Sequence, residues 1–207
     1  MQLTLVTGNK HKAEEWRRMM PADFKLTSHA VDLDELQSLD ADAVIEHKVR
    51  QAYAQLGVPV VLVDADMRNP TLHKFVAKTN GYGLSNYLSG HESKEELVRK
   101  SAIKNVSIVT AGPVAPSPVD LLMGPRFGQL MDQLQAAGYE YIIIDGPPIL
   151  GLADAIVLGN QIGSVLYVAQ ASQTRKSHIK DAFRRLRMAG VVPRGIVLTR
   201  ATARNTA

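Results

Sequence analysis

Residues 60–64 carry the sequence VVLVD, four apolar residues followed by an aspartate. A short β-branched run of this kind is typical of a strand that is buried on both faces of a parallel sheet. Similar runs lie at residues 106–110 and 141–145, and helix-forming stretches separate them. The alternation of short apolar runs with amphipathic stretches predicts βαβ units.

The same pattern extends over most of the chain. We expect strands at residues 3–7, 24–27, 59–64, 106–110, 141–145, 164–169 and 195–199. We expect helices at residues 10–20, 40–56, 118–137, 152–159 and 174–189, with shorter helical pieces between residues 71 and 100. Because crossovers between parallel strands are almost always right-handed, this order predicts an α/β three-layer sandwich, with a mostly parallel sheet of about seven strands and helices on both faces.

The composition is that of a globular protein, with 45% hydrophobic and 21% charged residues among 207. No linker or repeat divides the chain, so we expect a single α/β domain over residues 1–207. No apolar run reaches the ~18 residues of a membrane helix, and residues 1–20 lack the apolar core of a signal peptide. The absence of cysteine excludes disulfides, thiolate zinc sites and cysteine nucleophiles. These observations favour a cytoplasmic protein with no membrane partner.

The formal net charge is +4, and the positive charge is concentrated near the carboxyl end, where residues 171–207 contain nine Arg or Lys against one acid. One interpretation is nonspecific nucleic-acid binding. The other is a solvated helix face, which we favour because aromatic residues, at 5%, offer few stacking platforms for bases. The residues that would contact nucleic acid are Arg175, Lys176, Lys180, Arg184, Arg185 and Arg187.

Three aspartates follow two of the predicted strands. Ligands of open α/β sheets bind beyond the carboxyl ends of the strands, where Asp64, Asp66 and Asp145 are expected to lie. These carboxylates can hold Mg²⁺ directly or through water, and Asp145 follows an apolar run as a Walker B acid does. Arg68 can pair with an acid or contact a phosphate. We therefore take the three aspartates as candidate catalytic and metal residues, Arg68 as a candidate cofactor contact and Mg²⁺ as the candidate cofactor.

A second candidate site follows the first predicted strand. Thr7, Gly8, Asn9 and Lys12 form a turn that enters a helix, and a helix N-terminus with nearby ammonium groups can hold phosphate oxygens. The sequence G-x-x-x-x-G-K-[ST] occurs nowhere in the chain, so the phosphate cradle of P-loop enzymes is absent. The serines and histidines show neither a nucleophile elbow nor zinc-ligand spacing.

Five segments from residue 61 onward match a known family: 61–70 (VLVDADMRNP), 83–90 (GLSNYLSG), 111–122 (AGPVAPSPVDLL), 141–155 (YIIIDGPPILGLADA) and 190–198 (GVVPRGIVL). Through them, from Asp64 to about residue 200, the chain resembles the cytoplasmic domain of bacterial tyrosine kinases, the capsule and exopolysaccharide regulators related to deviant Walker ATPases. The resemblance implies that Asp64 and Asp66 are Walker A′ acids and that Asp145 is the Walker B acid. It further implies ATP with Mg²⁺, self-phosphorylation on a C-terminal tyrosine cluster and ring-like oligomers. No Walker A loop precedes Asp64, however, and residues 201–207 contain no tyrosine.

A second resemblance is carried by the segments 5–15 (LVTGNKHKAEE), 32–37 (DLDELQ) and 59–64 (PVVLVD), and by the helix with Ile45, Glu46 and Lys48. Through them, residues 2–63 resemble the N-terminal half of the inosine triphosphate pyrophosphatase family, which converts non-standard nucleoside triphosphates to monophosphates. The resemblance implies that Thr7, Asn9 and Lys12 touch the nucleotide and that Glu35 helps to hold a metal. Ala65 stands where that family continues with a second acid, and its base-recognition half does not follow.

The two resemblances meet at the run VVLVD, and each half lacks what the other half replaces. Our leading hypothesis is therefore an engineered or fragment-recombined chimera with no efficient catalysis and at most weak binding of Mg²⁺ and a nucleoside triphosphate. The alternatives are a pyrophosphatase acting on non-standard purine nucleotides and an ATP-binding protein similar to tyrosine kinases. Exposed apolar surface on the helix at residues 40–56 leaves a homodimer open.

Overall fold

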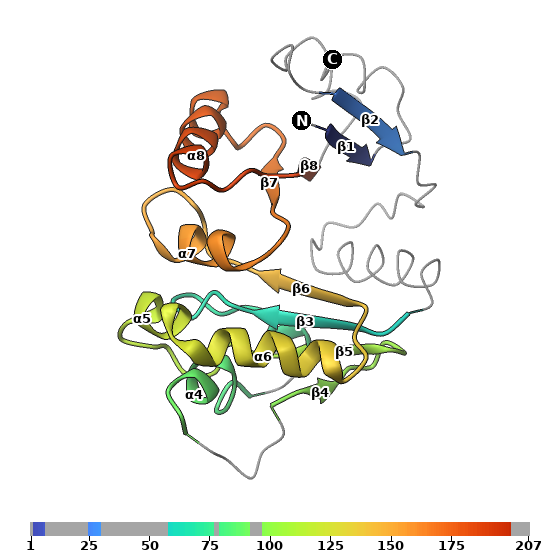
Figure 1. Ribbon diagram of the computed structural model, residues 1–207, viewed down its shortest axis with the longest axis vertical. Coiled ribbons are helices and arrows are strands. Elements are labelled where there is room, and N and C mark those ends of the chain that lie inside the picture. Colours follow the sequence, from blue (N-terminus) through green and yellow to red (C-terminus); the bar gives the residue numbers. More distant parts are fainter. Residues whose placement is uncertain (1, 7–24, 30–57, 77–78, 92–96, 200–207) are drawn as a thin grey trace. The chain divides into compact units, whose positions relative to one another are not determined.

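The computed structural model describes residues 2–6, 25–29, 58–76, 79–91 and 97–199 (Figure 1). The chain divides into two compact units, one formed by Leu33–Leu158 and the other by Met1–Asp32 together with Gly159–Ala207. Each unit is described by itself below. The predicted helices at residues 10–20 and 40–56 lie outside the described residues.

The unit Leu33–Leu158 contains a four-stranded sheet in the order β4-β5-β3-β6. Strand β3 (Val60–Asp64) lies in the middle and pairs in parallel with both neighbours, β5 (Val106–Val109) and β6 (Tyr141–Asp145). Every residue of β5 and four of the five residues of β3 are buried, as expected of a doubly covered strand. The apolar runs thus form most of the sheet. Because β3 and β6 run in parallel, their carboxyl ends lie side by side at one end of the sheet.

Strand β4 (Arg99–Lys100) is a two-residue strand that pairs antiparallel with β5, and the sequence pattern did not predict it. A run of two residues is too short to show an alternating pattern. The sheet is therefore mixed, with three parallel strands and one short antiparallel strand at an edge.

Within the described part of this unit, four short or medium helices accompany the sheet. They are α3 (His73–Val76), α4 (Leu84–Leu88), α5 (Pro118–Met123) and α6 (Pro125–Ala136). Figure 1 shows α6 running along the sheet, and its buried side chains Phe127, Leu130 and Leu134 recur at helical spacing. Helix α6 therefore covers the sheet with a single apolar stripe.

The single helix predicted at residues 118–137 is wrong in one respect, because Gly124 divides it into α5 and α6. Gly124 has an extended backbone, with φ of −69° and ψ of 159°, and it precedes Pro125. A residue before proline is driven out of the helical region by contact with the proline ring, and proline itself favours the first turn of the next helix. The Gly-Pro pair thus ends one helix and starts another.

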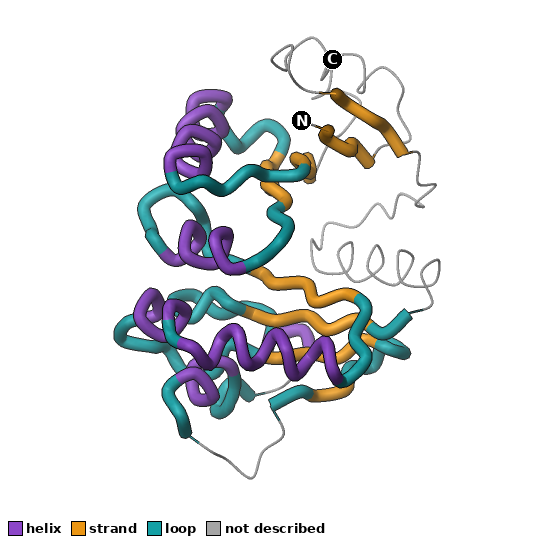
Figure 2. Tube along the Cα trace, viewed as in Figure 1, coloured by secondary structure: helices purple, strands orange, loops and turns teal. Residues whose placement is uncertain are grey.

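In the second unit, the described residues form two pairs of parallel strands, drawn in orange in Figure 2. Strand β1 (Gln2–Val6) pairs with β2 (Lys25–His29), and β7 (Leu166–Gln170) pairs with β8 (Gly195–Thr199). Between β7 and β8 lies α8 (Lys176–Met188), and the ring of Phe183 on α8 meets Tyr167 edge-on at 5.4 Å. Helix α7 (Asp154–Gln161) begins in the first unit and ends in the second.

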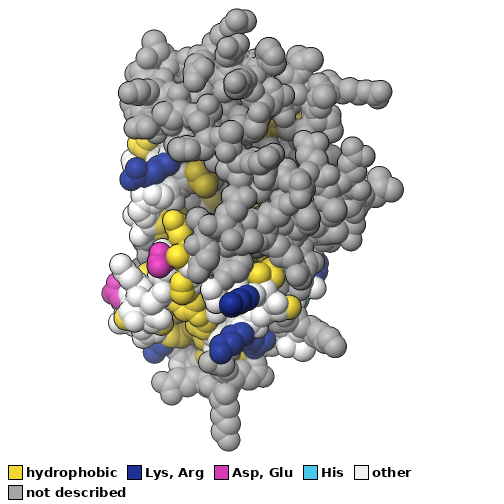
Figure 3. Space-filling view, turned by 90° about the vertical axis from the view of Figure 1, so that its right-hand side faces the viewer, with side chains coloured by type: hydrophobic (Ala, Val, Ile, Leu, Met, Phe, Trp, Pro, Cys, Tyr) yellow, Lys and Arg dark blue, Asp and Glu magenta, His cyan; other side chains and the backbone are white. Residues whose placement is uncertain are grey.

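The α/β class and the predominantly parallel pairing are confirmed, but a single sheet of about seven strands is not what the described residues form. Their strands belong to three sheets, of two, four and two strands. Alternate residues of β6 are exposed, among them Tyr141 at 48% and Ile143 at 51%, because β6 ends its sheet. Apolar side chains are visible on the surface of the described part in Figure 3. The single-domain assignment stays a prediction.

Among the described residues, no helix is long and apolar enough to span a membrane.

Candidate functional site

Asp64 and Asp145 are the last residues of two neighbouring strands, and they occupy paired register positions at the carboxyl-terminal end of the four-stranded sheet. The backbone N–H of Ala65 donates to the carbonyl oxygen of Asp145 at 2.8 Å, so the chains stay together just beyond the strands. The sequence predicted that each acid follows a strand, and the structure shows that these two strands are neighbours.

The carboxylate of Asp64 is fully buried and organises the segment that follows β3. One of its oxygens accepts the N–H of Asp66 at 3.2 Å, and the other accepts those of Thr71 at 3.2 Å and Leu72 at 3.0 Å. Burial raises the pKa of Asp64 above its ordinary value, and the three hydrogen bonds oppose this effect by stabilising the charged form. Asp64 therefore fixes the course of residues 64–72.

Asp66 is half-buried and faces the same loop. Its Oδ1 atom accepts the N–H groups of Arg68 at 3.2 Å and Asn69 at 2.9 Å. The structure gives its Oδ2 atom no hydrogen bond within the described residues. One oxygen of Asp66 thus holds the loop, and the other is available to a ligand.

Asp145 is an exposed residue at the end of β6. Partial removal of its carboxyl group from water raises its pKa, and the nearby negative charges of Asp64 and Asp66 raise it further. Three carboxyl groups therefore lie close enough to influence one another electrostatically. A cation placed among them would relieve that repulsion.

Arg68 contacts a fourth acid, Asp154, that the sequence analysis did not select. Its Nε atom donates to Oδ2 of Asp154 at 2.6 Å and its Nη2 atom donates to Oδ1 at 3.1 Å. Asp154 is 1% exposed and is the first residue of α7. From sequence, this aspartate resembles any acid in the first turn of a helix, and only the three-dimensional pairing distinguishes it.

The acids suit a water-rich magnesium site more than a closed metal cage. Among the described residues, no group of three or more His, Cys, Asp or Glu side chains is placed to hold a metal ion together. Mg²⁺ commonly binds proteins through one or two carboxylates and completes its coordination with water and phosphate oxygens. Asp66 and Asp145 meet that requirement, whereas both oxygens of Asp64 already accept backbone hydrogen bonds.

The predicted phosphate and metal residues of the N-terminal segment cannot be placed against these acids. Thr7, Gly8, Asn9, Lys12 and Glu35 lie outside the described residues. Their proposed roles stay predictions from sequence.

The loop after β5 is bonded tightly to the segment before α4, near the same end of the sheet. The side-chain amide of Asn80 donates to the carbonyl of Gly112 and accepts its N–H at 2.9 Å. A Cβ atom on Gly83 would lie 2.2 Å from the carbonyl oxygen of Thr110, so only glycine fits there. These contacts give the resemblance motifs GLSNYLSG and AGPVAPSPVDLL a shared structural role.

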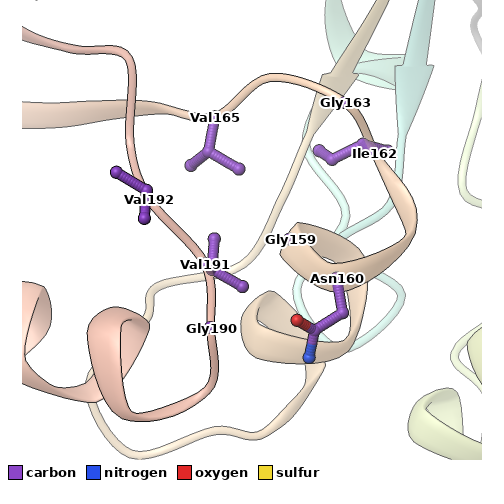
Figure 4. A pocket seen from close by; sticks show the side chains of 8 residues that line it. All are labelled: Gly159, Asn160, Ile162, Gly163, Val165, Gly190, Val191 and Val192. Atoms are coloured by element: carbon purple, nitrogen blue, oxygen red, sulfur yellow. The ribbon is translucent and has the colours of Figure 1, made fainter. Parts of the chain in front are cut away.

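One pocket lies in the other unit, between the end of α7 and the loop that follows α8 (Figure 4). It has a volume of about 230 Å³ and is bordered by glycines and valines together with Asn160 and Ile162. No titratable side chain lines it, so it offers no general acid or base.

No protein-family model matches the chain. Individual relatives do match. CapB of Staphylococcus aureus, named as a tyrosine-protein kinase, is 30% identical over 164 residues, which are 79% of this chain and 72% of CapB. The tyrosine-protein kinase YwqD of Bacillus subtilis is 37% identical over 130 residues, 63% of this chain and 54% of YwqD.

The similarity to CapB is not confined to the part after Asp64. A match of 164 residues in a chain of 207 begins at or before residue 44. Other relatives are much longer, and the chain spans only about a fifth of the tyrosine kinase from the cps region of Klebsiella pneumoniae.

Solved structures show the same fold. The kinase domain of the Escherichia coli tyrosine kinase ETK has a TM-score of 0.67 and 25% identity, covering 98% of this chain and 69% of that domain. The cell division ATPase MinD of Pyrococcus furiosus, at 17% identity and a TM-score of 0.58, covers 99% of this chain and 77% of MinD and shows the fold alone. From the CapB match, the chain belongs to the bacterial tyrosine-protein kinase family.

Proposed function

We propose that this chain is an ATP-binding domain of the tyrosine-kinase type. It holds a nucleotide with Mg²⁺ beyond the carboxyl ends of β3 and β6. The register pairing of Asp64 with Asp145 carries the proposal, because it brings the acids of the VVLVDAD and YIIID segments together. Family membership supports the same assignment, since CapB and YwqD are named as tyrosine-protein kinases.

The three acids take different roles in this proposal. Asp145 and the free oxygen of Asp66 would hold Mg²⁺, directly or through water, while Asp64 keeps residues 64–72 in place. Bound Mg²⁺ neutralises charge on the phosphate groups of the nucleotide. Partial removal from water and the neighbouring acids raise the pKa of Asp145, and a bound cation would oppose this effect by stabilising the charged carboxylate.

The phosphate-binding part of the proposal rests on sequence. From the sequence, Thr7, Gly8, Asn9 and Lys12 are the proposed contacts to phosphate oxygens, and no Walker A loop occurs in the chain. Phosphoryl transfer depends almost entirely on positioning and charge stabilisation. We therefore propose nucleotide binding as the principal activity of this chain and expect phosphoryl transfer to be slow.

Thermal unfolding with Mg²⁺ and ATP tests this function. A ligand at about 100 times its dissociation constant adds about 2.7 kcal/mol of stability, which raises the Tm of a chain this size by several degrees. The Asp145→Asn variant is expected to lose the Mg²⁺-dependent part of this shift. The exposed Asp132 on α6 supplies a matched control, and Asp132→Asn is expected to keep the full shift. Equal shifts in both variants, or none in the unmodified chain, would refute the assignment.

The pyrophosphatase alternative predicts a different result with inosine triphosphate. It uses Thr7, Asn9, Lys12 and Glu35 together with Asp64, and it predicts release of pyrophosphate. A Lys12→Ala variant would then lose turnover that Asp145→Asn retains. A chimeric origin stays a prediction from sequence, and the reach of the CapB similarity to residue 44 or earlier does not require one.

A further inference from the structure

The Arg68–Asp154 ion pair joins the two segments that carry the candidate magnesium acids. Arg68 belongs to the loop after β3, and Asp154 lies at the end of the segment that leaves β6 after Asp145. The guanidinium uses two donors and the carboxylate uses both oxygens, at 2.6 and 3.1 Å. A two-point contact fixes the orientation of both side chains, whereas a single contact allows rotation.

The pair is connected to the acids by short paths. The backbone N–H of Arg68 donates to Asp66, so the residue that reaches Asp154 through its side chain also holds Asp66 through its main chain. Asp154 is 1% exposed, while 40% of the Arg68 side chain is exposed. The acid is therefore the fixed partner, buried at the start of α7, and the arginine is anchored to it.

The partner of the Arg68 side chain differs from the one that the sequence suggested. The sequence made it a candidate phosphate contact, yet its guanidinium is turned toward Asp154 and held there. An exposed ion pair of comparable length, Arg184–Asp181 on α8, joins residues three apart on one helix and ties no segments together. The 86-residue separation of Arg68 and Asp154 is what allows their pair to bridge two loops.

We propose that Arg68 and Asp154 are positioning residues of the magnesium–nucleotide site: their ion pair sets the placement of Asp66 relative to Asp145 and thereby sets the affinity for the metal. This inference rests on the proposed function. Groups that orient metal ligands typically change metal affinity by about 10- to 100-fold when they are removed.

The test compares ATP binding with and without a divalent cation, using the full chain and isothermal titration calorimetry. The ratio of the dissociation constant in EDTA to that in Mn²⁺ measures the contribution of the metal. We expect Asp154→Asn to reduce this ratio about 10-fold and to leave binding in EDTA nearly unchanged. A merely structural role would weaken binding equally under both conditions. Paramagnetic resonance of free Mn²⁺ gives a second readout that does not depend on activity.

Two further variants complete the design. Asp181→Asn removes the exposed Arg184–Asp181 pair with the same change of charge and is expected to keep the full ratio. Arg68→Lys keeps the charge but not the two-point contact, so it is expected to reduce the ratio of dissociation constants less than Asp154→Asn does. If Asp154→Asn does not fold, Arg68→Lys alone tests the inference. The inference is overturned if the ratio is unchanged in the folded Asp154→Asn variant, or in Arg68→Lys when only that variant folds. Either result leaves the proposed function intact. A ratio of one in the unmodified chain overturns the proposed function itself.

Discussion

Asp64 and Asp145 occupy paired positions at the ends of adjacent parallel strands, yet the first is fully buried and the second is exposed. Among the strands that the structure describes, β3 has a neighbour on each side and β6 is the last of its sheet, in keeping with this difference. The two acids therefore have different roles in the candidate site. Asp64 uses its oxygens within the protein, and Asp145 presents its carboxylate to solvent.

Stability should fall as the pH rises above the ordinary range of a carboxyl group. The pKa of Asp145 is raised by partial removal of its carboxyl group from water and by neighbouring charges, so the folded chain binds this proton more tightly than the unfolded chain. Its contribution is fully present below the unfolded pKa and is lost as the pH rises through the folded pKa. In urea titrations from about pH 4 to pH 8, Asp145→Asn should show a flatter decline in the free energy of unfolding. A slope equal to that of Asp132→Asn would contradict this prediction.

Gly83 should not accept any side chain. A Cβ atom there would lie 2.2 Å from the carbonyl oxygen of Thr110 and 2.4 Å from the nitrogen of Gly112, and both are backbone atoms that cannot rotate away. We expect Gly83→Ala to lower the free energy of unfolding by at least about 2 kcal/mol. Gly128 on α6 has open space around it, so Gly128→Ala should stabilise the chain by about 0.5–1 kcal/mol. Chemical denaturation of the two variants measures both effects, and similar midpoints would refute the argument.

The apolar stripe of α6 should dominate the stability of its unit. Phe127 is fully buried, and replacing it with alanine should reduce the free energy of unfolding by about 3–5 kcal/mol through lost burial and a residual cavity. Met123 on α5 is 67% exposed, so Met123→Ala should change it by less than about 0.5 kcal/mol. Comparable losses in the two variants would mean that α6 does not pack as the structure has it.

Gly159 and Val191 should be energetically coupled. A Cβ atom on Gly159 would lie 2.9 Å from Cγ1 of Val191 and 3.2 Å from Cγ2, and valine has few alternative rotamers to relieve the contact. We expect Gly159→Ala to destabilise the chain by about 1–2 kcal/mol, and Val191→Ala to relieve part of that loss. A double-mutant cycle measures the coupling, and strictly additive effects would exclude it.

Much of the fold could be predicted because its strands are defined locally. The ranges 141–145 and 195–199 match β6 and β8, and 59–64 differs from β3 by one residue. The left-handed conformations of Gly138 and Gly190, with φ of 87° and 75°, confirm the predicted helix ends. The division of the strands among three sheets is not local, because pairing depends on which strands meet in space.

The candidate site was predicted less completely. Asp64, Asp66 and Asp145 could be selected because each follows an apolar strand. Asp154 could not, since its significance comes from Arg68, which lies 86 residues away in the sequence. Pairing across such a distance leaves no periodic signal.

Strand β4 bears on how the protein avoids association with itself. Strand β5 has the sequence VSIV, and a long apolar strand at the edge of a sheet is a template for adding strands from other molecules. Instead, the edge is occupied by Arg99 and Lys100, a two-residue strand in which both side chains are basic. Short and charged edge strands disfavour such addition, so this small element protects the β5 side of the sheet from pairing with other molecules.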